Sequence, residues 1–145
     1  MSKKKNGNVQ LDLFEALSGK VAVDRERARA DIVKKVDRCI RLLNEEWGMN
    51  IEMPELRFDL KGAHAGQVIT EGSDALFPVL RFNLAVAIAN WPDFLETTVP
   101  HEVAHLGVHA KWGRRPRVHG REWKATMATL GVPAKRCASD SSTTP

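Results

Sequence analysis

Hydrophobic residues recur every three or four positions in the first third of the chain. The series consists of Ile32, Val36, Ile40, Leu43 and Trp47. This spacing places the five side chains on one face of an α-helix. Asp24 is suited to cap the start of that helix and Gly48 to end it, so the pattern predicts an amphipathic helix between these two residues.

The following segment changes to the two-residue period of β-strands. Apolar and charged residues alternate over residues 56–60, and turn signals follow at Lys61-Gly62 and at residues 71–74. The turns lead into the apolar segments AHAGQVIT and PVLRFN, which we interpret as two further strands. Three short strands after a long helix, without a regular βαβ alternation, predict an α+β fold.

A helical pattern resumes at Asp93 and runs to about Trp112, and a last helix is predicted from about Gly120 to Leu130. Pro100 interrupts the first of these stretches and allows two interpretations. It can occupy the first turn of a helix capped by Thr97 or Thr98, or it can kink a longer helix that begins at Asp93.

The length of 145 residues indicates one domain with a real hydrophobic core. We expect that domain to span residues 20–137, between a flexible basic leader (1–19) and a disordered tail (138–145). Cys39 and Cys137 lie far apart and form no CxxC pair, which favours a reduced, cytoplasmic protein. No apolar run has the length of a membrane span or the pattern of a secretory signal, so we expect no membrane partner.

The net charge is +4, and lysine and arginine gather in the leader, in residues 25–38 and in residues 111–121. Such basic clusters permit contact with nucleic acid through a basic surface. The middle cluster is interrupted by Glu26, Asp31 and Asp37, so a solvated helix face explains it equally well.

The segment HEVAH, residues 101–105, has the spacing of a zinc-binding helix. Four residues advance a helix by about 400°, so His105 lies one turn beyond His101 on nearly the same face. Two imidazoles in this arrangement can bind one Zn²⁺, with Glu102 beside them as the candidate catalytic base.

A catalytic zinc ion takes three protein ligands and keeps one position open, so a third ligand must lie downstream. The candidates are His109, which continues the same helix face, Glu122 in the last helix, and His119 at the entrance of that helix. One straight helix cannot easily place three ligands around a tetrahedral ion, which disfavours His109. Glu122 fits the pattern of enzymes that use a carboxylate from a second helix, but we favour His119 because it offers a neutral nitrogen donor near pH 7. The longer motif HExxHxxGxxH is excluded, because Val108 and Lys111 occupy its glycine and histidine positions.

The order of these motifs resembles the SprT family of metalloproteases, which includes the eukaryotic Spartan protease. The shared features are the helix motif HEVAH (101–105), a basic connector (111–118), the segment HGREW (119–123) and the upstream strands HAGQV (64–68) and LRFN (80–83). The likeness covers roughly residues 30–137. It implies a zincin-like fold with a long N-terminal helix, a three-stranded sheet, the HExxH helix and a C-terminal helix that carries the third ligand.

Carried over residue by residue, the resemblance implies that His101, His105 and His119 bind Zn²⁺ and that Glu102 is catalytic. Many bacterial relatives continue into a cysteine-bearing zinc ribbon. Cys137 alone cannot form a four-ligand zinc site, so we expect any ribbon contribution to DNA or substrate contact to be absent or supplied otherwise.

An apolar pentapeptide in the leader matches the motif by which bacterial polymerases and repair proteins bind the β sliding clamp. It consists of Gln10, Leu11, Asp12, Leu13 and Phe14. A leucine and a phenylalanine on a flexible leader are suited to anchor in an apolar pocket of a partner. The alternative is a short amphipathic helix in which Leu11, Phe14 and Leu17 pack on the core.

Together these features predict a zinc-dependent endopeptidase that cleaves DNA-bound or DNA-crosslinked proteins and reaches DNA through the sliding clamp. Its role would be the repair of DNA–protein crosslinks, at the nucleoid. Two alternatives remain: a noncatalytic zinc-containing adaptor between the clamp and DNA, and a metalloprotease with one regulatory protein as its substrate. In either protease, an exposed edge strand around Ala65 to Val68 is suited to pair with an extended substrate.

Overall fold

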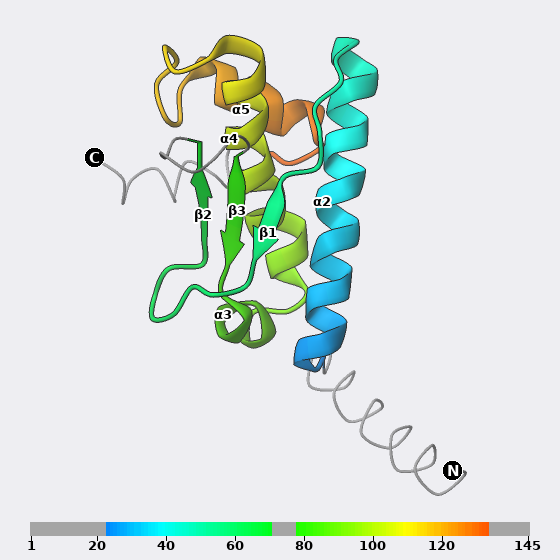
Figure 1. The fold of residues 1–145 in the computed structure, drawn as a ribbon, viewed down its shortest axis with the longest axis vertical. Helices are drawn as coiled ribbons and strands as arrows, with labels where there is room; N and C mark the ends of the chain where they lie inside the picture. Colours follow the sequence, from blue (N-terminus) through cyan, green and yellow to red (C-terminus); the bar gives the residue numbers. More distant parts are fainter. Residues whose placement is uncertain (1–22, 71–77, 134–145) are drawn as a thin grey trace, which may run out of the picture.

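The computed structural model describes residues 23–70 and 78–133. Its elements are, in chain order, α2 (Arg25–Trp47), β1 (Glu55–Arg57), β2 (Gly66–Ile69), β3 (Val79–Phe82), α3 (Leu84–Ala89), the π-helical segment η1 (Phe94–Thr98), α4 (Val99–Trp112) and α5 (Arg121–Thr129) (Figure 1). The prediction of an α+β fold with three short strands is confirmed. The predicted leader and its pentapeptide, the turn at 71–74 and the tail 138–145 lie outside the described residues.

Helix α2 begins and ends at the residues that the sequence indicates. A side-chain oxygen of Asp24 accepts a hydrogen bond of 2.7 Å from the backbone N–H of Arg27, which satisfies one of the free donors of the first turn. Gly48 ends the helix in the left-handed conformation, with φ of 62°, which a residue without Cβ adopts readily. The predicted apolar face is buried from Ile32 to Leu43.

The sheet has the order β1-β3-β2, so the last strand in sequence is the central one. β1 pairs with β3 in parallel, and β2 pairs with β3 in antiparallel orientation. Val79, Leu80 and Phe82 of β3 are buried, as expected for a central strand. Among the described strands β2 pairs with β3 alone, so its other edge runs along the rim of the sheet.

The polypeptide between β3 and α4 differs from the prediction. Helix α3, capped by the side chain of Asn83, was not expected, because its sequence LAVAIA is apolar on all sides and has no period. Pro100 lies in the first turn of α4, as in the first interpretation, but the side chain of Thr98 makes no cap hydrogen bond and the helical segment η1 leads directly into α4. Instead, the Val99 N–H donates to the carbonyl of Phe94, five residues back, in the π-helical pattern.

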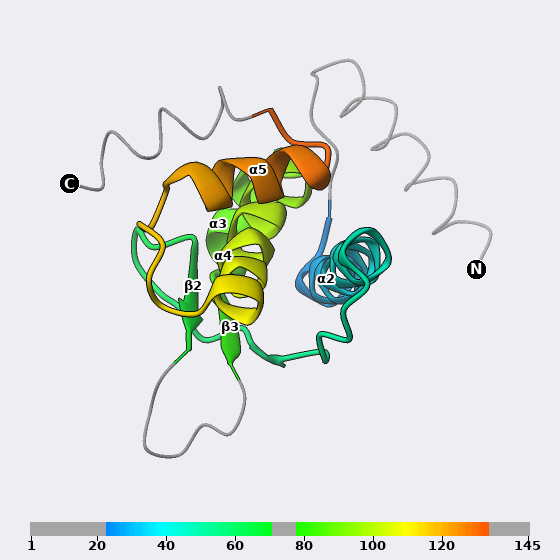
Figure 2. The ribbon, with the colours of Figure 1, turned by 90° about the horizontal axis from the view of Figure 1, so that it is seen from above.

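Helix α4 occupies the centre of the molecule. Seen from above, it lies between α5, α2 and the strands β2 and β3 (Figure 2). Val99, Val103 and Leu106 belong to the main core, whereas Ala104 and Val108 pack in a second cluster with residues of α5. Within the described residues, no helix is both long and apolar enough to cross a membrane.

Helices α2 and α4 approach closely where α4 carries Gly107. A Cβ atom at this position would lie 2.8 Å from Cδ1 of Leu43 and 3.3 Å from the ring of Trp47. One turn further along α4, the ammonium group of Lys111 lies 4.5 Å from the ring centre of Trp47 and 4.9 Å from that of Trp112. The glycine therefore sets the spacing of two helices whose ends are joined by a cation–π contact.

We predict that Gly107→Ala lowers the free energy of unfolding by about 1 kcal/mol, because overpacking costs about 1–3 kcal/mol and exceeds the gain of about 1 kcal/mol in helix propensity. Urea denaturation measures the change. The control is Ala110→Gly at an exposed position of the same helix, which reports the propensity effect alone. A stabilising Gly107→Ala substitution would show that the two helices are not closely packed there.

Candidate metal centre

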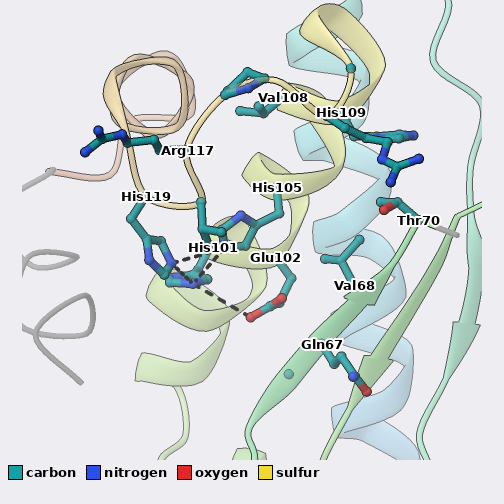
Figure 3. Close-up of a pocket in the computed structure, with 15 residues that line it drawn as sticks. Gln67, Val68, Thr70, His101, Glu102, His105, Val108, His109, Arg117 and His119 are labelled. Atoms are coloured by element: carbon teal, nitrogen blue, oxygen red, sulfur yellow. Dashed lines mark hydrogen bonds and ion pairs between the residues drawn. The ribbon is translucent and has the colours of Figure 1, made fainter. Parts of the chain in front are cut away.

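Three histidine side chains converge on one point. His101 and His105 come from consecutive turns of α4, and His119 comes from the connector just before α5 (Figure 3). Their Nε2 atoms form a triangle in which each side is 3.2 Å long. The structure brings His119 together with the HExxH pair, although His119 precedes α5 and is not part of it.

The triangle fits a tetrahedral metal ion. Bonds of about 2.0–2.1 Å from zinc to imidazole nitrogen require nitrogen–nitrogen separations of about 3.3–3.4 Å. The observed sides of 3.2 Å agree with this requirement. Three neutral imidazoles cannot form hydrogen bonds along all three sides of this triangle, because each Nε2 atom is either a donor or an acceptor. The three side chains can therefore hold one metal ion.

The buried position of His105 keeps its ring neutral. The pKa of His105 is lowered to about 3, chiefly by burial, which disfavours the imidazolium form, and to a smaller extent by the neighbouring rings of His101 and His119. A neutral imidazole has a free lone pair, which is the form that binds a metal ion.

The indole ring of Trp123 packs against all three imidazole rings. It is completely buried, and its ring centre lies 4.9 Å from that of His101, 5.6 Å from that of His105 and 4.6 Å from that of His119. Its indole N–H also donates a hydrogen bond of 3.3 Å to the backbone carbonyl of His101. Trp123 belongs to the segment HGREW, but the sequence indicates no role for it, because the contact forms only when α5 packs on α4.

Glu102 lies beside the triangle and is 8% exposed. Its Oε2 atom is 4.0 Å from Nε2 of His101. The start of β2 covers its other side, where a Cβ atom at Gly66 would lie 2.8 Å from Cγ of Glu102. Glycine at this position therefore allows the edge strand to approach the carboxylate closely, a role that the sequence alone does not reveal.

Asn83 fixes the segment that leads into β2. Its side-chain amide donates hydrogen bonds of 3.0 Å to the carbonyl of Gly62 and 2.9 Å to that of His64. Its side-chain oxygen accepts from the N–H of Val86, and its backbone N–H donates to Ala65. One buried residue thus links the start of α3 to the approach of β2 toward Glu102.

The two other ligand candidates do not join the triangle. Among the described residues, the group of side chains that can share an ion consists of His101, His105 and His119. His109 lines the same cleft one turn beyond His105, and Glu122 lies in the first turn of α5. The connector before α5 brings His119 to His101 and His105, and its Nε2 supplies the third corner of the triangle.

A cleft of about 640 Å³ opens over the triangle. β2 forms one wall, α4 forms the floor and the connector that carries His119 forms the other wall (Figure 3). Glu102, His101 and His105 all line this cleft, so a molecule within it can reach both the carboxylate and the nitrogens of the triangle.

Comparison with known proteins matches residues 36–142 to the SprT-like family. A curated relative, Protein SprT of Pseudomonas putida, is 35% identical over 105 residues, which cover 72% of this chain and 61% of that protein. Protein SprT of Pseudomonas paraeruginosa is 36% identical over 104 residues, covering 71% and 60%. The chain thus spans about three fifths of the length of these relatives. No solved structure matches it significantly.

We predict that the full chain binds one metal ion and that His119→Ala weakens this binding by about 100-fold or more, because it removes one of three ligands. Zinc titration against a chromogenic chelator, with metal content after dialysis, provides the measurement. The matched controls His109→Ala and Glu122→Ala keep one ion each. Loss of the ion in either control, with retention in His119→Ala, would identify a different third ligand.

Proposed function

Since this chain belongs to the SprT-like family, we propose that it is a zinc-dependent endopeptidase that cleaves DNA-bound or DNA-crosslinked proteins. The observation that carries the proposal is the convergence of three imidazole nitrogens beside a buried carboxylate at the floor of an open cleft. This combination is the ligand set of a hydrolytic zinc site together with its general base.

His101, His105 and His119 would hold the zinc ion. When bound, zinc polarises a carbonyl group and lowers the pKa of a coordinated water toward neutrality. Glu102 accepts the proton of the attacking water and then delivers it to the leaving amine, so that the same carboxylate is first base and then acid. The sequence contains no tyrosine, so a tyrosine hydroxyl does not stabilise the developing oxyanion.

The edge of β2 offers a binding surface for the substrate backbone. An extended peptide that adds to this strand would form main-chain hydrogen bonds independent of its side chains. Gly66 places the start of the strand directly against Glu102, so a peptide paired there lies over the catalytic carboxylate. Such binding supports cleavage of many different proteins, as removal of crosslinked proteins from DNA requires.

Recruitment to DNA is the second part of the proposal. The pentapeptide Gln10–Phe14 would bind the β sliding clamp, and basic side chains would contact phosphates. DNA binding predicts cleavage that weakens as salt rises, whereas a protease specific for one regulatory protein predicts cleavage that is independent of DNA and salt. A noncatalytic adaptor requires a fourth protein ligand at the zinc ion, and among the described residues the group that could hold an ion contains only the three histidines.

We predict that the zinc-loaded chain cleaves a protein crosslinked to DNA and that Glu102→Gln slows cleavage by about 10²- to 10⁴-fold, the usual contribution of a general base. Gel electrophoresis of the crosslinked substrate follows the reaction. Glu122→Gln, a second glutamate outside the triangle, serves as the matched control. Intact substrate with the wild-type chain, despite one bound zinc ion, would favour the adaptor.

We also predict that the double substitution Leu13→Ala and Phe14→Ala abolishes binding to the β sliding clamp, because both side chains would fill the apolar pocket of the partner. Surface plasmon resonance with immobilised clamp measures the binding. Replacing Leu17 by alanine is the control, since it lies outside the pentapeptide. Undiminished clamp binding by the double variant would refute this route of recruitment. The proposal of a zinc site does not depend on that result.

A further inference from the structure

The edge strand β2 is held at its start by one buried side chain. Within the described sheet β2 pairs with β3 alone, and its first residue, Gly66, lies opposite Phe82. The residue after Phe82 is Asn83, which is 2% exposed. Figure 1 shows that the segment before β2 and helix α3 lie at the same end of the sheet. Asn83 therefore stands where the start of β2 meets the start of α3.

Both ends of the Asn83 amide form hydrogen bonds. Its oxygen accepts from the Val86 N–H at 3.2 Å and caps α3. Its nitrogen carries two N–H donors, which bond the carbonyl of Gly62 at 3.0 Å and that of His64 at 2.9 Å. A helix cap requires only the acceptor, which aspartate or serine supplies equally well. The two donors therefore serve the segment before β2 and not the helix.

The segment bound to Asn83 ends at the carboxylate of Glu102. The backbone N–H of Asn83 donates to the Ala65 carbonyl at 3.0 Å, so three carbonyls within residues 62–65 bond to one residue. Gly66 follows directly, and a Cβ atom there would lie 2.8 Å from Cγ of Glu102. Contact with Glu102 thus leaves β2 no room to move closer to α4, and the hydrogen bonds to Asn83 keep its start from moving away.

We propose that Asn83 is a positioning residue for the substrate, because its amide fixes the edge of β2 where a paired peptide lies over Glu102. The inference rests on the proposed peptidase function and adds a residue that acts on the substrate through β2. Main-chain hydrogen bonds weaken quickly with displacement, and a shift of about 1 Å in a bound substrate can slow its reaction by about 100-fold. Loss of the two donors should therefore weaken peptide pairing and cleavage, while the three histidines keep their ion.

Asn44 provides a matched control. Its side chain also joins a helix to a backbone segment, since its nitrogen donates to the Ile51 carbonyl at 3.1 Å and its oxygen accepts from the Ile51 N–H at 2.7 Å. Asn44 lies near the end of α2 and does not line the cleft. At either position, replacement by aspartate keeps the acceptor, removes the donors and adds one negative charge. The two variants therefore differ in the segment that is released.

The test measures main-chain pairing directly. One peptide is compared with two N-methylated versions, in which one or the other set of alternate amides outside the scissile bond is blocked. Fluorescence anisotropy measures their binding to the zinc-loaded full chain with Glu102→Gln. We expect the unmethylated peptide to bind about tenfold more tightly than one of the two methylated versions, the effect of one or two main-chain hydrogen bonds. Adding Asn83→Asp should remove this ratio, and adding Asn44→Asp should retain it.

Cleavage is measured in the same substitutions with Glu102 intact. Asn83→Asp should lower kcat/KM for the unmethylated peptide by about tenfold and keep one zinc ion, whereas Asn44→Asp should retain the wild-type value. Urea denaturation checks the fold of each variant. Asn83→Ser, which keeps the cap and adds no charge, takes the place of Asn83→Asp if that variant does not fold.

The outcomes separate Asn83 from the peptidase. Loss of the zinc ion or of the fold in both Asn83 variants would assign this residue a structural role and overturn the proposal, as would an unchanged ratio or an equal loss in Asn44→Asp. Binding with the expected ratio, but no cleavage by the wild-type chain, would sustain the role of Asn83 in peptide pairing and refute the peptidase. Cleavage with equal binding of all three peptides would overturn the positioning role alone.

Discussion

The fold depends on bringing three imidazole nitrogens to one point from two separate segments. One helix can supply His101 and His105 by its own periodicity, but the third nitrogen arrives only if the connector folds back over α4. The packing of α5 on α4 holds the connector in this position. Trp123 of α5 is buried against all three imidazole rings, and its indole N–H donates a hydrogen bond to the carbonyl of His101. The second hydrophobic cluster, small as it is, therefore controls the geometry of the metal centre.

Two glycines allow neighbouring elements to pack closely on α4, one toward α2 and the other toward β2. Gly107 lets α2 come within contact of the helix through Leu43, and Gly66 lets β2 reach Glu102. In both places a single methyl group would collide with a side chain of the neighbouring element. The neighbouring elements thus pack closely on the central helix, while a cleft opens over its histidines and carboxylate.

Local patterns were sufficient for the parts of the fold that local forces determine. The caps and apolar face of α2 and the spacing of the HExxH pair follow from neighbouring residues, and the sequence predicted both. The strand order, with β3 between β1 and β2, depends on contacts distant in sequence and was not predicted. Helix α3 was missed because a uniformly apolar segment has no period, and the roles of Gly66 and Trp123 appear only in the packed structure.

The position of Trp123 also has an optical consequence. The sequence has four tryptophans and no tyrosine, so its near-ultraviolet emission comes almost wholly from indole rings. Within the described structure, Trp123 is the one indole among them whose ring contacts all three imidazoles of the histidine triangle. Protonation or coordination of those rings changes the surroundings of its excited state directly. The chain therefore contains an intrinsic fluorophore at the candidate metal centre, which reports on the three imidazoles without label or substrate.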